Sequence, residues 1–452
     1  MKDGQPTTIY ALATPPGKSA IAVIRISGPL ASSVPDLFGC DLPSSGQMTF
    51  MKYRDRDGGL LDEGMFVWSA GPKSSTGEDV AEIHCHGSSA VISALLDNLA
   101  EADGFRIALP GEFTRRALDN NKMDITAVEG LADLIDSETA LQHRQALSQM
   151  SGRLRKPVQR WREILVSNLA HLEAVIDFSD EELPDHLSVQ IKQDTEALIT
   201  DLKASLDDKG LGELIRTGFQ LAIIGPVNAG KSTALNALAG RPAAIVSDVA
   251  GTTRDVVQVR LDIGGIPVVV TDTAGWRAVT ADIIEQEGIK RAAEQAEQAS
   301  FRVIILDVCQ SDWQQQAQMF CEWGSSPALI IANKADIAPL SDMPAQICGH
   351  PVLSMCLQNT DDVVRLETYL ERHIAEISGS HQDILLTRTR HRDAVSEALS
   401  RLEASQRLSL YDEPEIVAEE FRAAATALGY ILGHVDVEDL LSHIFSSFCI
   451  GK

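Results

Sequence analysis

Residues 225–232 read GPVNAGKS, a Gly-x-x-x-x-Gly-Lys-Ser pattern that sets strict conditions on the fold around it. The pattern lies between the apolar run 219–224 and the Ala/Leu-rich run 233–239, which predict a strand and a helix. A glycine-rich turn lets several backbone N–H groups converge on phosphate oxygens at the positive end of the helix. An ordinary strand-to-helix turn is the alternative, but it needs neither Lys231 against the β/γ oxygens nor a Ser232 hydroxyl on Mg²⁺. The segment therefore predicts an α/β unit that binds a nucleoside triphosphate.

The base is indicated by the tetrad Asn333, Lys334, Ala335 and Asp336, which follows the apolar run 328–331. The carboxylate of Asp336 can accept the N1 and N2 protons of guanine, whereas adenine offers no such pair of donors and would leave a buried charge unpaired. An Asn-Lys-x-Asp tetrad alone is weak, but this one stands roughly 100 residues after the phosphate loop, in the order that a GTPase requires. The sequence therefore predicts GTP rather than ATP.

Two further motifs predict segments that respond to the γ-phosphate. Asp272, Thr273, Ala274 and Gly275 follow the apolar run 268–271, so that Asp272 can hold the Mg²⁺ shell and the Gly275 amide can contact the phosphate. Upstream, residues 251–255 read GTTRD and offer a hydroxyl to the metal. Each motif alone is typical of a turn. In this order they predict two switch segments, because both contact groups that are lost on hydrolysis.

Trp276 follows Gly275, at a position where many GTPases have a glutamine that orients the attacking water. Because an indole cannot orient that water, another group must place it and neutralise the transition state. Asn228 in the phosphate loop offers a carbonyl oxygen to a monovalent cation. Glu285 could hold the water, although a solvated carboxylate at the start of a helix is the alternative.

Length and composition predict a cytosolic protein with about three domains. The chain has 452 residues, and no apolar run approaches the roughly 18 residues of a membrane span. Its start, MKDGQPTTIY, does not have the pattern of a signal peptide. The seven cysteines are scattered and predict reduced thiols. His84, Cys85 and His86 suggest a metal site, but strand alternation places Cys85 on the opposite face from the two histidines.

The formal net charge of −25 argues against indiscriminate binding of nucleic acid, so any RNA contact must be local. Three basic residues, Arg153, Lys156 and Arg160, have the spacing of one helix face. Such a face is either a local RNA contact or an ordinary solvated surface. The full set of basic candidates in this region is Arg144, Arg153, Arg155, Lys156, Arg160 and Arg162.

Hydrophobic periodicity predicts four successive parts of the chain, with residues 1–118 as a compact α/β unit and residues 211–377 as the GTPase segment. Helical periodicity covers residues 119–210 and resumes over residues 378–452, with Asp436 as the N-cap of the last helix. Two helical blocks that flank an α/β unit predict that the GTPase is inserted into one helical domain. The apolar seams are Leu154, Val158, Trp161, Leu165, Leu169 and Leu172 in the first block and Val417, Phe421, Ala424, Leu428 and Ile431 in the second.

Several motifs along the whole chain resemble one family, the bacterial and organellar tRNA-modification GTPases called MnmE or TrmE. These motifs are ATPPG (13–17), IRISG (24–28), GEDV (77–80), PGEFT (110–114), AIVSDVAGTTRD (244–255) and FCIGK (448–452). The resemblance implies a multidomain α/β plus α protein. It has an N-terminal α/β domain that binds folate and dimerises, a discontinuous helical domain, and an inserted Ras-like P-loop GTPase domain with a mainly parallel sheet.

The resemblance also implies an activity and partners. Members act with an FAD-binding MnmG-type flavoprotein to place a carboxymethylaminomethyl or aminomethyl group on the wobble uridine of tRNA, using a folate one-carbon unit such as 5-formyltetrahydrofolate. GTP hydrolysis, with Mg²⁺ and K⁺, drives the cycle in a cytoplasmic homodimer without a membrane partner. A regulatory GTPase that binds RNA or ribosomes without one-carbon chemistry is the alternative.

The site residues that the resemblance implies are matched by motif position. The catalytic residues are Glu285, which positions water, and Cys449, whose chemical role is open. The folate residues are Arg25, Glu82, Lys122 and Lys452. Mg²⁺ is held by Ser232 and Thr253, and K⁺ by Asn228 with main-chain oxygens of Ser247, Val249 and Thr252. The GTP-binding set is Asn228, Ala229, Gly230, Lys231, Ser232, Thr233, Ser247, Asp248, Val249, Ala250, Gly251, Thr252, Thr253, Asp272, Thr273, Ala274, Gly275, Asn333, Lys334, Asp336 and Ser354.

Three positions depart from the family pattern. Val227 stands where proline is usual before the asparagine, which we expect to change the stiffness of the loop. Met355 follows Ser354 where alanine is expected, so the contacts of that loop with guanine are open. Trp276 is bulky, but it agrees with a mechanism that does not use glutamine.

Overall fold

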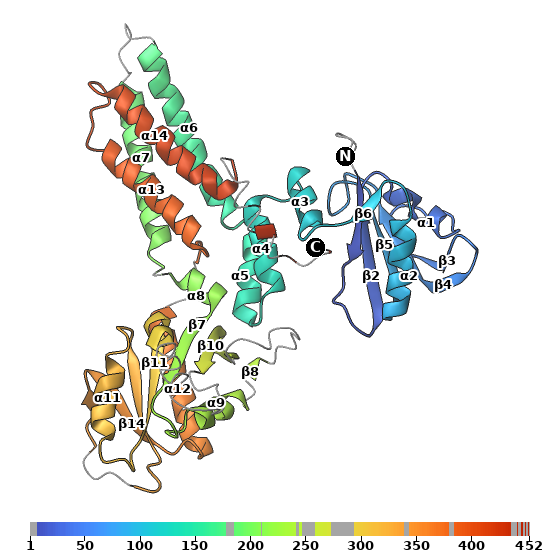
Figure 1. Cartoon of the computed structure of the whole chain (residues 1–452). Helices are drawn as coiled ribbons and strands as arrows, with labels where there is room; N and C mark the ends of the chain where they lie inside the picture. The colour runs from blue at the N-terminus through green and yellow to red at the C-terminus, as the bar shows by residue number, and fades with distance from the viewer. Residues whose placement is uncertain are drawn as a thin grey trace. The chain divides into compact units, whose positions relative to one another are not determined.

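The computed structural model of the chain describes residues 7–177, 185–208, 210–240, 244–245, 258–272, 293–338, 343–378 and 384–434, with positions 441, 444–445, 448 and 451. These residues form two compact units. The first contains Met1–Ala132, Ser148–Asp194 and Ser400–Lys452, and the second contains Asp133–Leu147 and Thr195–Leu399. Figure 1 shows the elements of both units.

The first unit contains a six-stranded sheet with the order β3-β4-β5-β2-β1-β6. All neighbouring strands are antiparallel except β1 and β6, which are parallel. The strands are β1 (Thr8–Leu12), β2 (Ser19–Ser27), β3 (Thr49–Arg54), β4 (Leu60–Ser69), β5 (Val80–Gly87) and β6 (Phe105–Ile107). The compact α/β unit predicted at the start of the chain is therefore present, with β2 and β5 where the apolar alternations lie.

One face of this sheet is covered by α1 (Val34–Leu37) and α2 (Ser89–Ala100), as Figure 1 shows for α2. Ile83 and Cys85 of β5 point into this core, and the half-exposed Glu82 and His84 alternate with them. Burial raises the pKa of the Cys85 thiol to about 11, so that the thiol is protonated at neutral pH. The predicted alternation is confirmed, and it separates the Cys85 side chain from those of His84 and His86.

The opposite face of the sheet has a smaller apolar cluster at one edge. Phe113, from α3 (Glu112–Asp119), packs there against Ile9 and Ala11 of β1. Beyond α3, α4 (Ile125–Ile135) carries Ile125 and Val128 into a cluster with residues near the end of the chain: Leu441, Ile444, Phe445 and Phe448. The N-terminal domain and the C-terminal segment therefore share one packed unit.

The helices α6 (Arg155–Asp177) and α14 (Pro414–Leu432) pack along each other (Figure 1), and Arg422 Nη2 donates to Glu173 Oε1 at 2.9 Å. Both predicted apolar seams are buried, except that Leu169 is only partly buried while its neighbour Asn168 is buried. The predicted N-cap at Asp436 lies outside the described residues. Two more long helices, α7 (Asp185–Leu206) and α13 (Thr389–Ser405), begin in one unit and end in the other.

The second unit contains an eight-stranded sheet with the order β13-β14-β12-β11-β7-β10-β9-β8. The central run from β10 to β14 is parallel, and the outer pairs are antiparallel. The predicted mainly parallel sheet is confirmed. Its strands are β7 (Phe219–Ile224), β8 (Ala244–Ile245), β9 (Gln258–Ile263), β10 (Ile266–Asp272), β11 (Phe301–Asp307), β12 (Ala328–Asn333), β13 (Gln346–Ile347) and β14 (His350–Met355).

Helices cover both faces of this sheet (Figure 1). One core includes side chains from α8 (Leu211–Thr217), α9 (Lys231–Ala239) and α12 (Thr360–Ser378), and the other includes α11 (Trp313–Cys321). The start of α5 (Ala140–Met150) also belongs to this unit, because Leu141 packs against the first core and Arg260 Nη1 of β9 pairs with Glu138 Oε2 at 2.8 Å.

No helix in the described parts of the chain is long and apolar enough to cross a membrane.

Candidate functional site

The phosphate-loop sequence connects β7 to α9, as the flanking patterns predict. Gly225 has φ +146°, and a Cβ atom there would lie 2.1 Å from the carbonyl oxygen of Ile305 in β11. Gly230 has φ +109°, and a Cβ atom there would lie 2.2 Å from Asn333 Nδ2. Both positions therefore require glycine for steric reasons. Asn228 also has a positive φ, of 64°, and its side chain is exposed at the tip of the loop.

Lys231 is the first residue of α9 and is 9% exposed. Its Nζ donates to the carbonyl oxygens of Gly225 at 2.8 Å and of Pro226 at 2.7 Å. The ammonium group is therefore held over the loop, at the end of the helix where backbone N–H groups are directed outward. The next residue, Ser232, is exposed on the same helix turn. This arrangement fits a triphosphate, with a cation and an accessible hydroxyl at one helix N-terminus.

Asn333 connects the phosphate loop to the guanine motif. Its side chain is 4% exposed, and Nδ2 donates to the Ala229 carbonyl oxygen at 2.8 Å. Its Oδ1 accepts from the Leu357 amide at 3.0 Å. One amide group therefore fixes the loop that holds phosphate relative to the end of β14, which carries Ser354. The sequence predicted that Asn333 belongs to the base site, but it did not predict this role as a bridge.

Lys334 has φ +66°, and its Nζ lies 2.6 Å from Asp307 Oδ2 at the end of β11. Burial alone would raise the pKa of Asp307, but hydrogen bonds from Lys334 and from the Cys309 amide outweigh that effect and lower it. The carboxylate of Asp307 is thus charged at neutral pH and orients the lysine stem. Asp307 was not predicted from the sequence, although its position directly after the apolar run 303–306 was a usable signal.

Asp336 follows in the turn after β12 and is exposed, so that its carboxylate is accessible to a base. Ser354 pairs with Ala332 in the parallel ladder between β12 and β14. Ala335 donates its amide to the Met355 carbonyl oxygen at 3.3 Å. The structure therefore brings the predicted phosphate loop, Asn333, Lys334, Asp336 and Ser354 to the carboxyl ends of neighbouring parallel strands, where open α/β sheets bind nucleotides.

The switch residues lie outside the described part of the chain, except for the backbone of Asp272 at the end of β10. The same is true of Glu285, which was predicted to position water, and of two residues of the C-terminal tail. The predicted site residues outside the described ranges are Ser247, Asp248, Val249, Ala250, Gly251, Thr252, Thr253, Thr273, Ala274, Gly275, Glu285, Cys449 and Lys452, and Trp276 lies outside them as well.

Two of the residues implied for folate meet in the N-terminal sheet. Arg25 of β2 and Glu82 of β5 are direct register partners, and Arg25 Nε lies 2.9 Å from Glu82 Oε1. Their side chains are 31% and 26% exposed. The second carboxylate oxygen of Glu82 lies 3.4 Å from His84 Nε2. This accessible pair can bind a ring that presents adjacent donors, while the guanidinium can meet a carboxylate.

Lys122 lies elsewhere in the same domain, after α3. Its Nζ donates to the carbonyl oxygen of Pro72 at 2.8 Å, in the loop between β4 and β5. The structure gives no direct contact between Lys122 and the Arg25–Glu82 pair. Both nevertheless lie near the start of β5, because that loop returns to the sheet at Val80, two residues before Glu82.

A network of charged side chains supports this loop and was not predicted from the sequence. Arg116 Nη1 of α3 donates to Glu78 Oε2 at 2.8 Å, and the same oxygen accepts from Ser27 at 2.8 Å. Glu112 pairs with Arg106 and Arg116 and accepts from the Leu109 amide. Burial alone would raise the pKa of Glu112, but these hydrogen bonds outweigh it and lower the value. The acidic residues of the GEDV and PGEFT motifs therefore hold the loops in place.

The C-terminal tail reaches the same domain. A Cβ atom at Gly451 would lie 2.2 Å from the carbonyl oxygen of Leu12, the last residue of β1. Leu12 pairs with Ile24, the neighbour of Arg25 in β2. Phe445 packs so closely on Gly111 that a Cβ atom there would lie 2.7 Å from the phenyl ring. Gly451 of the FCIGK motif therefore lies against the start of the ATPPG motif, on the strand that pairs with IRISG, a contact that no local pattern in the sequence indicates.

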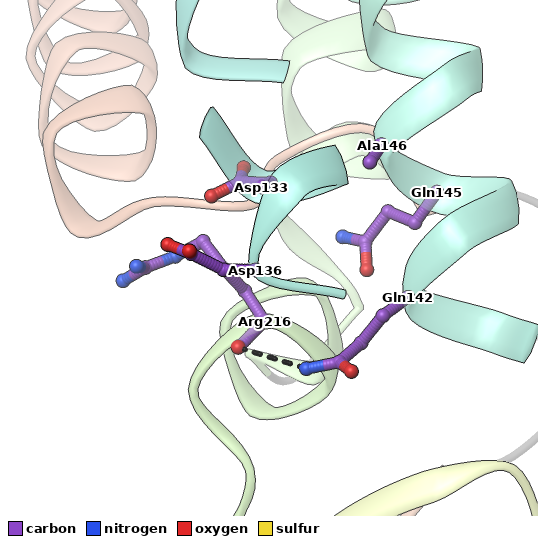
Figure 2. Close-up of a pocket in the computed structure, with 6 residues that line it drawn as sticks. All are labelled: Asp133, Asp136, Gln142, Gln145, Ala146 and Arg216. Carbon is purple, nitrogen blue, oxygen red and sulfur yellow. Dashed lines mark hydrogen bonds between the residues drawn. The ribbon is translucent and has the colours of Figure 1, made fainter. Parts of the chain in front are cut away.

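Figure 2 shows a separate cavity of about 80 Å³ in the second unit. Gln142 Nε2 donates to the Arg216 carbonyl oxygen at 3.3 Å along its wall. The volume is well below the roughly 300 Å³ at which ligand pockets begin. It therefore cannot hold a nucleotide or a folate. The lining residues are Asp133, Asp136, Gln142, Gln145, Ala146 and Arg216.

Comparison with known families gives two matches that together cover most of the chain. Residues 8–122 match the family described as GTP-binding protein TrmE N-terminus. Residues 125–449 match the family described as MnmE helical domain.

Curated relatives match over nearly the full length. A protein of Parvibaculum lavamentivorans named tRNA modification GTPase MnmE is 45% identical over 456 residues, covering 98% of this chain and 100% of that protein. Proteins of the same name from Paramagnetospirillum magneticum and Maricaulis maris are each 44% identical, covering 98% and 99% of this chain and 99% and 100% of those proteins.

Among solved structures, the G domain of the T. maritima FeoB iron transporter is 16% identical, with a TM-score of 0.26. It covers 34% of this chain and 98% of that chain. The FeoB G domain of Methanococcus jannaschii is 20% identical, with a TM-score of 0.25, and covers 34% of this chain and 97% of that chain.

Proposed function

This chain belongs to the tRNA modification GTPase family MnmE, and on that premise we propose that it couples GTP hydrolysis to one-carbon chemistry at the wobble uridine of tRNA. It is a GTPase that takes part in tRNA modification. The proposed product is 5-carboxymethylaminomethyl or aminomethyl uridine. It would be made with an FAD-binding MnmG-type flavoprotein and a folate such as 5-formyltetrahydrofolate, by a homodimer in the cytoplasm.

The observation that carries the one-carbon part is the Arg25–Glu82 pair, at 2.9 Å. Arg25 lies on β2, which pairs with β1, and the last residue of β1 lies against Gly451. The carboxylate can accept from the ring donors of a pterin, and a guanidinium suits a glutamate tail. The contact of Gly451 with the end of β1 supports a role for the C-terminal motif at this site. We propose that Arg25, Glu82, Lys122 and Lys452 bind folate and that Cys449 acts beside it.

The proposed GTP site uses the phosphate loop with Asn333, Lys334 and Asp336, and Ser232 with Thr253 for Mg²⁺. We propose that K⁺ binds at Asn228 with main-chain oxygens of Ser247, Val249 and Thr252, and that Glu285 positions the attacking water. The exposed Asn228 at the loop tip supports the cation, because its side chain is not engaged in holding the loop. A cation placed there could neutralise charge that develops on the phosphates.

The cation proposal is tested by GTP hydrolysis in equal concentrations of K⁺ and Na⁺. We expect K⁺ to accelerate the parent by more than about tenfold, since neutralising groups at this position are worth several powers of ten. Asn228→Ala should remove the difference, whereas Asn236→Ala, an exposed asparagine on α9, should keep it. Equal rates in both salts for the parent would reject the K⁺ site.

The folate proposal is tested by calorimetry of the full chain with 5-formyltetrahydrofolate. We expect Glu82→Gln to lose binding, because the amide cannot accept two ring donors, while the exposed Glu101→Gln on the same domain keeps it. Absence of binding by the parent would favour a GTPase without one-carbon chemistry. Nucleoside analysis of wobble uridines in cells that carry Cys449→Ser tests the role of the tail.

A further inference from the structure

We propose that the basic surface at the start of α6, formed by Arg153, Arg155, Lys156 and Arg160, binds the phosphate backbone of tRNA. The inference rests on the proposed function, because it assigns the polyanion to the tRNA whose modification involves this family. It adds the surface by which an acidic chain holds that substrate beside the proposed one-carbon site.

All four side chains of this basic surface are exposed. Arg153 lies in the turn before α6, and the helix then begins at Arg155, with Lys156 and Arg160 one turn apart. The other side of the same turns is buried, with Val158 and Trp161 in the helical core. Arg153, Lys156 and Arg160 are therefore all solvent-facing, as their spacing in the sequence predicted, and Arg155 is exposed next to Lys156 in the first turn.

The place of these cations on the helix opposes the helix dipole. The N-terminus of a helix carries a partial positive charge, so that acidic residues are favoured in its first turn and basic residues weaken it. The first turn of α6 has no acidic residue. Stability alone does not select such an arrangement. The helix dipole and the exposed cations of the patch, of which Arg155 is partly neutralised by Asp124, favour the approach of a phosphate backbone.

The neighbourhood of the patch points to the same substrate. Arg155 Nη1 lies 3.2 Å from Asp124 Oδ2. Asp124 also caps α4, since its Oδ1 accepts from the Ala127 amide at 3.0 Å, and it follows Lys122 by two residues. One ion pair therefore connects the patch to the segment that carries a proposed folate residue. A nucleic acid bound here would lie beside the domain where the one-carbon unit is proposed to be held.

The charge of the whole chain makes this patch selective. With a formal net charge of −25, most of the surface repels a polyanion, so binding depends on a few local cations. An acidic surface of a partner protein would also be attracted to such a patch. The position of the patch beside Lys122 favours the RNA, because the substrate base must reach the one-carbon site.

The test measures the dissociation constant of the full-length protein for a purified tRNA by fluorescence anisotropy. The KCl concentration is varied between 50 and 300 mM, the range over which phosphate contacts lose affinity steeply. For Lys156→Ala with Arg160→Ala we expect binding weaker by about tenfold or more at physiological salt. We also expect a slope of log K against log salt that is less steep by about two. Lys156→Arg should retain the parent values, because a phosphate contact requires charge and reach. Lys192→Ala, an exposed lysine on α7, is the matched control and should retain them too.

Parent affinity and slope in the double variant would overturn the proposal, and so would an equal loss in Lys192→Ala. Normal tRNA binding with lost binding of the flavoprotein would assign the patch to a protein partner and would also overturn it. Equal midpoints of thermal unfolding show that the variants are folded. Folate calorimetry on the same samples separates the two proposals. If the parent binds no folate while the double variant still shows the less steep salt dependence of tRNA binding, the one-carbon function is rejected and the tRNA-binding surface is retained.

Discussion

At the scale of single residues, the proposed GTP site contains groups that satisfy the backbone as well as groups that are accessible to a ligand. Asn333 is the clearest case, since its amide bonds both the Ala229 carbonyl oxygen and the Leu357 amide in a buried position. Removing a side chain that satisfies two buried backbone groups leaves both desolvated without a partner. The predicted phosphate loop and the segment after β14 would then lose their connection through Asn333.

We therefore expect Asn333→Ala to destabilise the protein by about 2–6 kcal/mol, from two lost partners at roughly 1–3 kcal/mol each. It should also weaken binding of a fluorescent GDP by at least about tenfold. Asn236→Ala is the matched control, because that side chain is exposed on α9. Urea unfolding and nucleotide titration measure the two effects. Wild-type stability with lost nucleotide binding would show that Asn333 contacts only the ligand.

Glu112 gives a prediction of pH dependence. Burial would raise its pKa, but hydrogen bonds from Arg106, Leu109 and Arg116 lower it below the ordinary 4.5. A carboxyl group with a lowered pKa in the folded state stabilises the fold fully above its unfolded pKa, and this contribution is lost as the pH falls through the folded value. Glu112→Gln should thus cost about 2 kcal/mol at pH 7.

The difference between Glu112→Gln and the parent should shrink below about pH 4.5, as the parent itself is protonated. Urea unfolding of the full chain between pH 3 and pH 7 checks this, with Glu101→Gln as the control, since the Glu101 side chain is 63% exposed. A constant difference over the whole pH range would show that the charge of Glu112 is not involved.

At the scale of secondary-structure elements, the C-terminus of α11 is capped by a buried arginine side chain of β11. Arg302 of β11 has 0% exposure, and its guanidinium donates to the carbonyl oxygens of Cys321 at 2.9 Å and of Ser326 at 2.6 Å. The last carbonyl groups of a helix have no partner within the helix, so this buried cation satisfies them. Burial lowers the pKa of Arg302, yet a guanidinium stays charged.

Arg302→Met keeps much of the volume and removes the donors. We expect a loss of about 3–5 kcal/mol, since carbonyl groups that a buried cation satisfied would remain without partners. Arg372→Met on α12 is the control and should cost less than about 1 kcal/mol, because Arg372 is 69% exposed. Thermal unfolding of both variants decides the matter, and a small effect of Arg302→Met would mean that water replaces the guanidinium.

A helix or strand could be predicted from the sequence where its own local hydrophobic pattern determines it. The strand β7 covers the apolar run before the phosphate loop, and α14 buries the predicted seam from Val417 to Ile431. The partners of Asn333, Lys334 and Arg116 could not be predicted, because they are fixed by strand order and by loops distant in sequence. The same limit explains Leu169 and Asn168, where the rotation of α6 against its neighbours decides which side chain is buried.

At the scale of the whole molecule, segments that are far apart in the sequence pack together. The C-terminal residues Phe445 and Phe448 pack on Ile125 and Val128, and α14 packs on α6. The GTPase segment lies between these halves in the sequence, so the packed helical unit takes side chains from both sides of it. This agrees with the discontinuous helical domain implied by the family resemblance, while the predicted boundaries at residues 118, 210 and 377 stay predictions.

A substitution at Gly451 tests most directly how the C-terminal residues pack on the N-terminal domain. At Gly451, with φ +103°, a Cβ atom would lie 2.2 Å from the Leu12 carbonyl oxygen, so Gly451→Ala must displace either the tail or the end of β1. We expect weaker binding of 5-formyltetrahydrofolate, by about tenfold, since a displacement of about 1 Å is enough to misplace groups that hold a ligand. GTP hydrolysis without tRNA should be unchanged, because the phosphate loop belongs to the other unit.

Gly46→Ala is the matched control: Gly46 has φ +80° with no atom within 4 Å of its Cβ position, so it has the same backbone strain without the collision. Calorimetry of the parent and both variants measures the folate affinity. Equal loss in both variants would assign the effect to backbone strain, and unchanged binding in Gly451→Ala would separate the tail from the folate site.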